Sequence, residues 1–311
     1  MIIDFHTHNL PDTQAQRAIA AMLQRITRAI PFKPVGNGTL GRQLADMKAD
    51  GIDRAVMCPV ATKPEQAEVI VRHACEIRDG ACGEDAARMI IPFASLHPSD
   101  PYLLRHIDLV VNAGLRGIKL HPYYQGFALQ DPLVAPFLAS IRDAGLVTVC
   151  HCGLDLGYVG QSIDCGPKEI AALFARVPGL DRRFVAAHLG GFSGAPPHAV
   201  DRLLDSACFI DTAVLEVDQP KDEPRRIIAE WPADRIVFGT DYYWTSQRQL
   251  VEWVKALRPD PADREKIFHL NAERLLGLAV TARTDGQSRD EASADLNRPR
   301  PNPQEGQTRG A

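Results

Sequence analysis

Two histidines near the beginning of the chain have the spacing of a metal-binding pair. His6 and His8 close a short run of strand-forming residues, and alternate side chains of a strand point to the same face. Their Cα atoms should lie about 7 Å apart, given the rise of a strand, so both imidazoles can reach one metal ion. A chance pair or a tag remnant is the alternative, but a tag is a homopolymer outside the fold, whereas this pair ends an apolar strand.

Later apolar runs also end in residues that bind metals or acidic ligands. The fourth expected strand ends with Lys119 and His121, the fifth with His151, the sixth with His188 and the eighth with Asp241. Each is a weak signal, because a lone histidine is more often a hydrogen-bonded core or loop residue than a ligand. Zinc and similar ions take three or four nitrogen and carboxylate ligands and keep a position open for water. These residues supply such a set if the fold brings the strand ends together.

The elements that must position these residues alternate between strands and helices. Several expected strands are almost continuously apolar, which is typical of a parallel sheet buried on both faces. The expected helices have apolar residues at helical period. The strands are expected at residues 2–8, 54–60, 89–97, 116–121, 147–152, 184–189, 208–211 and 235–241, and the helices at 66–78, 103–112, 134–143, 168–176, 200–206 and 247–257.

A repeated turn supports this alternation. Gly51, Gly114, Gly145 and Gly179 each follow a helical segment and precede an apolar residue, as expected where a helix ends in a left-handed residue. The last two intervals, 31 and 34 residues, are the length of one strand–helix unit. The pattern predicts a (β/α)₈ TIM barrel, with a doubly wound open sheet as the alternative. Barrel active sites lie at the C-terminal ends of the strands, where all the polar residues above occur.

Composition narrows the class of protein. The chain has 311 residues, 45% of them hydrophobic, and a net charge of −4, and it has no basic block of the kind that binds nucleic acid. No apolar run approaches the roughly 18 residues of a membrane span, and no signal-peptide pattern precedes the first strand. The seven cysteines form no CxxC pair, which indicates reduced thiols. We expect a cytoplasmic enzyme for a small molecule, with no nucleic acid or membrane partner and with homo-oligomerisation left open.

Two segments depart from a minimal barrel. Residues 1–280 are expected to form the single domain, and residues 281–311 are polar and predict a disordered C-terminal tail. Residues 9–45 are longer than a barrel loop requires, and part of them, residues 14–29, is expected to be helical. Because this insertion follows the first strand at the barrel mouth, it is either a lid or substrate wall or a decorative or oligomerising addition.

The order of these motifs resembles the amidohydrolase superfamily of metal-dependent barrels. HxH on the first strand, lysine on the fourth, histidine on the fifth and sixth and aspartate on the eighth is that superfamily's order. The phrases GIKLHP around Lys119, AHLGG around His188 and GTDY around Asp241 look like its amidohydrolase-related branch, which contains hydrolases and non-oxidative decarboxylases. The resemblance covers about residues 1–280.

The resemblance implies a ligand set. It implies that His6, His8, His151 and Asp241 hold a divalent metal ion, for which zinc is the expected identity. It also implies that His188 contacts the metal-bound water or the substrate rather than necessarily the metal.

Physical chemistry suggests what these residues do around a bound ion. A bound divalent ion lowers the pKa of its water to about 7, which makes hydroxide available near neutral pH. Asp241 is expected to accept that water's proton and pass it to the leaving group, while His188 orients the water or stabilises the developing oxyanion. Asp4 either fixes an imidazole tautomer or is satisfied by the backbone, and the second interpretation is favoured.

Lys119 has three possible roles. It grips a substrate carboxylate, bridges two metals as a carboxylated lysine, or is structural and buried with a partner. His121, Tyr123 and Tyr124 are candidate substrate contacts, with His121 also a candidate for a second metal. Residues 242–244 are expected to wall the pocket.

The expected function is metal-dependent hydrolysis of an amide, ester or lactone by metal-activated water. The alternative is a metal-dependent non-oxidative decarboxylase (carboxy-lyase) of an unsaturated or aromatic acid. A decarboxylase should present a cation to the substrate carboxylate, for which Lys119 is available, and should exclude bulk water. A metal-binding barrel without catalysis is the third possibility.

Overall fold

The fold contains eight short parallel strands, each within a segment expected to be extended, and the polar residues singled out above lie on some of these strands or shortly after them. The computed structural model describes residues 1–26, 33–161, 164–214 and 222–278. Neighbouring strands pair in parallel throughout each ladder. The strands are β1 (Ile3–Thr7), β2 (Arg54–Met57), β3 (Ile90–Pro92), β4 (Gly117–Leu120), β5 (Val147–Cys150), β6 (Phe184–Ala186), β7 (Phe209–Asp211) and β8 (Ile236–Val237).

The strands close into a barrel. Strands β1–β3 form one ladder and β4–β8 another. An isolated parallel bridge between Ala94 and Ile118 joins the end of β3 to β4, and a second between Thr7 and Tyr242 joins β1 to the segment after β8. The predicted (β/α)₈ barrel is therefore confirmed, and the open doubly wound sheet is wrong.

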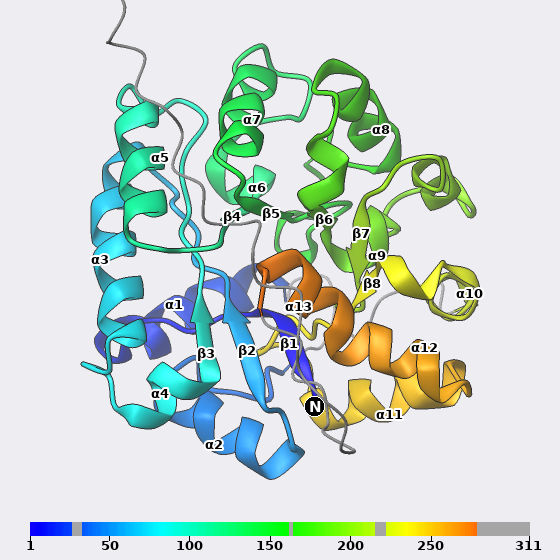
Figure 1. The fold of residues 1–311 in the computed structure, drawn as a ribbon, viewed down its shortest axis with the longest axis horizontal. Coiled ribbons are helices and arrows are strands. Elements are labelled where there is room, and N and C mark those ends of the chain that lie inside the picture. The colour runs from blue at the N-terminus through cyan, green and yellow to red at the C-terminus, as the bar shows by residue number, and fades with distance from the viewer. Residues whose placement is uncertain (27–32, 162–163, 215–221, 279–311) are drawn as a thin grey trace, which may run out of the picture. The chain divides into compact units, whose positions relative to one another are not determined.

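Helices surround the strands (Figure 1). Three predicted helices, α5, α7 and α11, have the expected bounds, but the segment expected as a helix at residues 200–206 is a 3₁₀ turn, because its hydrogen bonds span three residues, as from Leu204 N to Asp201 O. The α-helices are α1 (Asp12–Ile26), α2 (Leu40–Asp50), α3 (Ala67–Arg78), α4 (Glu84–Met89), α5 (Leu103–Asn112), α6 (Pro122–Gln125), α7 (Val134–Asp143), α8 (Pro167–Arg176), α9 (Ala187–Gly191), α10 (Asp222–Glu230), α11 (Gln247–Leu257), α12 (Pro261–Glu265) and α13 (Asn271–Leu276). The short turns are η1 (Pro64–Gln66), η2 (Leu156–Tyr158), η3 (Leu180–Arg183), η4 (Ala199–Leu203), η5 (Ala233–Arg235) and the π turn η6 (Lys266–Leu270).

The barrel has two apolar layers, one inside the ring of strands and one between the strands and the helices. They show which way each strand side chain points. Phe5 and Phe93 meet in the inner layer, edge to face, with ring centres 6.0 Å apart. Ile118 and Leu120 belong instead to the layer between strands and helices. Because side chains alternate along a strand, Lys119 between them points into the barrel.

One end of the barrel is closed by the last helix. Leu275 and Leu276 of α13 pack against the inner apolar layer, and the carbonyl of Leu275 accepts a hydrogen bond from Arg183, which directly precedes β6. Helix α13 thus covers the N-terminal ends of the strands, and the opposite end remains for the site.

The insertion after β1 forms α1 and α2. Helix α1 begins two residues before the expected helix, and residues 27–29 of that expectation lie outside the described residues. Ala18 and Met22 of α1 line the cavity at the C-terminal ends of the strands, so the insertion forms part of the cavity wall. Residues Met1–Leu278 form one unit, and the expected tail lies outside the described residues. No described helix is long and apolar enough to cross a membrane.

Candidate metal centre

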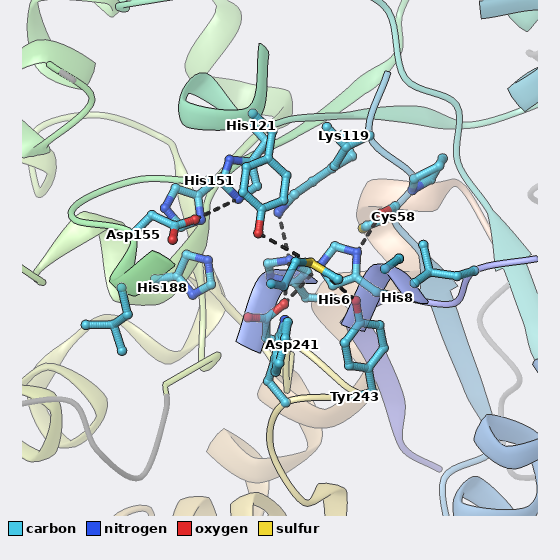
Figure 2. A pocket seen from close by; sticks show the side chains of 18 of the residues that line it. His6, His8, Cys58, Lys119, His121, His151, Asp155, His188, Asp241 and Tyr243 are labelled. Carbon is cyan, nitrogen blue, oxygen red and sulfur yellow. Dashed lines mark hydrogen bonds and ion pairs between the residues drawn. The ribbon is translucent and has the colours of Figure 1, made fainter. Parts of the chain in front are cut away.

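Three side chains from the beginning and the last part of the domain's sequence converge at the mouth of the barrel. His6 lies on β1, His8 directly follows that strand, and Asp241 follows β8. Nε2 of His8 lies 2.9 Å from Oδ1 of Asp241, and Nε2 of His6 lies 3.5 Å from the same oxygen. A donor atom from each of the three lies within 4.8 Å of the others (Figure 2). This spacing suits ligands of one ion, since zinc–ligand distances are about 2.0–2.3 Å.

The second nitrogen of each imidazole fixes how the ring faces. Nδ1 of His6 lies 2.8 Å from Oδ2 of Asp211 on β7, and Nδ1 of His8 lies 2.7 Å from the carbonyl oxygen of Cys58. A nitrogen that faces such an acceptor carries a proton, so Nδ1 of each ring points away from the centre and Nε2 of each ring faces it. Burial, and then the charge of Lys119, lower the pKa of His6 well below its usual range. His6 is therefore the neutral imidazole that metal binding requires.

Asp211 is a site residue that the sequence analysis did not single out. It is fully buried, and its Oδ1 accepts a hydrogen bond of 2.8 Å from the backbone N–H of His188. Burial raises the pKa of its carboxyl. One carboxyl group thus holds both the His6 ring and the turn after β6. The sequence could have identified Asp211, because the expected strand 208–211 ends in this aspartate just as other expected strands end in their site residues.

Asp4 fixes the backbone around the centre and contacts no imidazole. Its carboxyl accepts hydrogen bonds from the backbone N–H and the hydroxyl of Thr240, at 3.0 and 2.6 Å, and from Nε2 of Gln247 at 2.7 Å. Burial raises its pKa to about 7. The favoured interpretation of Asp4, an acid satisfied within the fold, agrees with these contacts. The role of fixing a tautomer falls to Asp211 instead.

Lys119 lies beside the same centre. Its side chain is fully buried, and Nζ lies 2.7 Å from Nε2 of His6. His6 is its one hydrogen-bond partner among the described residues. The ammonium group therefore lies where it can contact a ligand of the metal or an acidic substrate.

His151 belongs to a neighbouring group. Donor atoms of His151, His121 and Asp155 lie within 4.8 Å of one another. The His121 and His151 rings stack with centres 4.0 Å apart, and Nε2 of His121 lies 3.3 Å from Oδ2 of Asp155. Nε2 of His151 is buried without a hydrogen-bond partner in the described part of the chain. Of the four expected ligands, the structure therefore groups His6, His8 and Asp241 together. The fourth, His151, stacks on His121 and belongs to the group with Asp155.

His188 and Asp241, the expected catalytic pair, share an unusual backbone conformation. Their φ angles are 57° and 56°, in the left-handed region that non-glycine residues seldom adopt. Strained conformations of this kind cluster at functional sites. Nδ1 of His188 lies 3.1 Å from the carbonyl oxygen of Ala213, so its Nε2 is left for the cavity. Burial opposes ionisation of Asp241, but the hydrogen bond with His8 and the charges of His8, His188 and Lys119 together outweigh it and lower the pKa of Asp241.

These polar residues form the floor of a cavity of about 280 Å³. Ligand pockets start at about 300 Å³, so this one suits a small substrate. Lys119 is the only lysine or arginine among the described residues that line it. The remaining wall is mainly apolar and includes Leu10, Ala18, Met22, Ile26, Pro59, Val60, Leu154, Leu156 and Trp244.

The expected substrate contacts divide between the cavity and its surroundings. His121, Tyr124 and Tyr243 line the cavity. Tyr123 packs edge-on against the His151 ring and is not among the residues that line it. Tyr242 is also absent from the lining.

Comparisons with known proteins agree with this fold. The family model described as amidohydrolase matches residues 3–278. No curated protein matches the sequence significantly.

Several solved structures share the fold at low sequence identity. An uncharacterized TIM-barrel protein of Bordetella bronchiseptica is 20% identical with a TM-score of 0.68, over 89% of this chain and 98% of that one. A probable 2-pyrone-4,6-dicarboxylic acid hydrolase of Acinetobacter baumannii is 13% identical with a TM-score of 0.61, over 89% and 99%. A 5-carboxyvanillate decarboxylase of Novosphingobium aromaticivorans with bound manganese is 16% identical with a TM-score of 0.62, over 89% and 97%.

Proposed function

Because the chain belongs to the amidohydrolase family, we propose that it is a metal-dependent decarboxylase of a small unsaturated or aromatic carboxylic acid. The observation that carries the proposal is Lys119, the buried cation on the floor of a cavity with mainly apolar walls. Among the described residues no carboxylate lies in hydrogen-bond contact with this ammonium group, and a buried cation in that position favours an acidic ligand. The apolar wall favours a flat hydrocarbon skeleton and limits access of bulk water.

The donor set fits a divalent metal ion. Nε2 of His6, Nε2 of His8 and Oδ1 of Asp241 would hold it. The fourth donor of the expected set is Nε2 of His151, which is buried without a hydrogen-bond partner among the described residues. Neutral imidazole together with carboxylate suits zinc and manganese, and manganese is bound in one similar structure. When bound, such an ion supplies a Lewis acid that polarises a substrate oxygen.

The protein's own groups account for orientation and proton transfer. The ammonium group of Lys119 orients the substrate by attracting the negatively charged substrate carboxylate. When the bond between the substrate carbon and the carboxyl carbon breaks, CO₂ leaves and the electron pair remains on the substrate carbon. His188, held through Nδ1 by Ala213, enters this step as the imidazolium and delivers its Nε2 proton to that carbon. The ring is left neutral, and a proton from solvent restores the imidazolium. The apolar wall favours this step, because a charged carboxylate becomes neutral CO₂ in a site with little water.

Hydrolysis of a lactone or ester is the second candidate, and Asp241 favours it. Its lowered pKa keeps it a carboxylate that can accept a proton from water. The similar fold of a probable 2-pyrone-4,6-dicarboxylic acid hydrolase agrees with this candidate. Lys119 argues for decarboxylation, because a lactone or ester need not carry a carboxylate.

Solvent deuterium distinguishes the two reactions. The purified protein is analysed for metal, loaded with zinc or manganese, and incubated in D₂O with hydroxybenzoates, unsaturated dicarboxylates and aromatic lactones, with products followed by NMR. Decarboxylation places one deuteron on the carbon that lost the carboxyl group and releases CO₂. Hydrolysis opens the lactone or ester without forming that C–D bond. Lactone opening without any decarboxylation in the panel would overturn the proposal.

A further inference from the structure

Four buried or half-buried tyrosines around the cavity differ in what their hydroxyl groups contact. The Tyr158 hydroxyl accepts a hydrogen bond of 2.7 Å from Arg25, and the Tyr242 hydroxyl donates one of 2.8 Å to Asp46. Neither residue lines the cavity. These two hydroxyls are thus engaged by charged partners outside it.

The other two hydroxyls, on Tyr124 and Tyr243, meet at a methionine. They lie 3.6 and 3.8 Å from Sδ of Met22 on α1, and all three residues line the cavity. A thioether is a weak hydrogen-bond acceptor, and a buried hydroxyl gains more from an oxygen acceptor. Two donors that converge on a weak acceptor inside a cavity favour a ligand oxygen that displaces the sulfur.

The surroundings favour an uncharged oxygen. Tyr124 stacks on His121 with ring centres 3.9 Å apart. Burial, and then the charges of Asp155, Tyr243 and Asp241, raise the pKa of Tyr124 well above its usual range. The phenols are therefore neutral donors at physiological pH. Because the nearby carboxylates repel a second anion, a carbonyl oxygen is the better match.

We propose that the Tyr124 and Tyr243 hydroxyls form a binding site for a carbonyl oxygen on the substrate, at which Met22 is the displaceable acceptor. The inference rests on the proposed function, in which Lys119 orients the substrate carboxylate. The substrate class is then a small unsaturated or aromatic acid that also carries a keto, aldehyde, ester or amide carbonyl.

Matched probes test the proposal without requiring turnover. Binding of the three acetylbenzoate isomers and of the corresponding ethylbenzoates to the metal-loaded protein is measured by calorimetry, so that each pair differs mainly by the carbonyl oxygen. Two neutral hydrogen bonds should make at least one acetyl isomer bind about tenfold more tightly than its ethyl counterpart. Tyr124→Phe and Tyr243→Phe should each reduce this ratio about threefold, and the double variant should abolish it, with ethylbenzoate affinity unchanged.

Two further variants distinguish the effect of the Tyr124 and Tyr243 hydroxyls from the effects of neighbouring residues. Tyr158→Phe, the matched control, should keep the wild-type ratio, because its hydroxyl contacts Arg25. Met22→Leu should keep or increase the ratio, because only the competing sulfur is lost. Equal affinities within every wild-type pair, or a preference that survives in the double variant or disappears in Met22→Leu, would overturn the proposal. Carbonyl preference without decarboxylation in the D₂O experiment would overturn the proposed function alone.

Discussion

His6 and Asp211 are 205 residues apart in the sequence, yet His6 Nδ1 lies 2.8 Å from Asp211 Oδ2. Both side chains are fully buried, and their strands, β1 and β7, are not paired with each other. The contact therefore spans β8, the strand that lies between them in the closed barrel. Its consequence is that Nε2 of His6 presents a lone pair at the candidate metal centre.

Asp211→Asn should weaken metal binding. The amide keeps the size of the side chain but no longer presents a carboxylate to Nδ1 of His6, and loss of such an outer contact typically costs about 10–100-fold in metal affinity. Chelator competition with zinc or manganese measures the change. Asp4→Asn is the matched control, since Asp4 is equally buried but contacts Thr240 and Gln247. Equal metal affinity in wild type and Asp211→Asn would contradict the orienting role.

Lys119→Met should separate the three roles of the lysine. If it orients a substrate carboxylate, metal content stays unchanged and KM for acidic substrates rises about tenfold or more, since a hydrogen bond to a charged group contributes about 1.5–3 kcal/mol. Metal analysis and steady-state kinetics measure both quantities. Loss of half the metal would indicate a carboxylated bridge. No change in either would leave a structural role.

His8→Ala and His121→Ala should affect the two donor groups differently. His8 belongs to the group with His6 and Asp241, whereas His121 belongs to the group with Asp155. We expect His8→Ala to remove most of the bound metal, because it leaves two of the three convergent donors, and His121→Ala to retain it while activity falls. Metal analysis by mass spectrometry after gel filtration checks this. Loss of metal in His121→Ala would instead assign an ion to the second group.

An ion pair away from the site should control stability in acid. The Glu223 carboxylate lies 2.7 Å from the Arg226 guanidinium and accepts a hydrogen bond from the backbone N–H of His198. Arg226, and then that backbone bond, lower the pKa of Glu223 below its usual 4.5. Because the folded pKa is lower than the unfolded one, this stabilisation is present above about pH 4.5 and is lost as pH falls through the folded pKa.

Glu223→Gln should therefore lower the melting temperature at pH 7 and make its fall in acid shallower. The difference from wild type should shrink below pH 4.5, as measured by thermal denaturation between pH 3 and pH 7. Glu230→Gln is the control, because Glu230 lies 3.4 Å from the same Arg226 but is more exposed. If the difference in melting temperature between wild type and Glu223→Gln stays constant from pH 3 to pH 7, ionisation of Glu223 does not contribute to stability as predicted.

The sequence alone determined the elements and the residues at their ends. Apolar runs located all eight strands, and the left-handed glycines predicted after the helices are present, as at Gly51 and Gly145, with φ of 72° and 71°. Strand periodicity also placed His6 with His8 and turned Lys119 into the barrel. These features were readable because they depend on local conformation and on the alternation of side chains.

Only the tertiary structure decided which of these residues meet. Asp211 contacts His6 because closure of the barrel leaves only β8 between β1 and β7, a relationship that no local pattern encodes. His151 lies with His121 rather than with His6, because ring stacking and the loop that carries Asp155 depend on side-chain rotamers and loop geometry. The convergence of Tyr124 and Tyr243 on Met22 likewise joins three segments from different parts of the chain. Strand ends could be predicted to gather, but their grouping depends on packing between elements far apart in sequence.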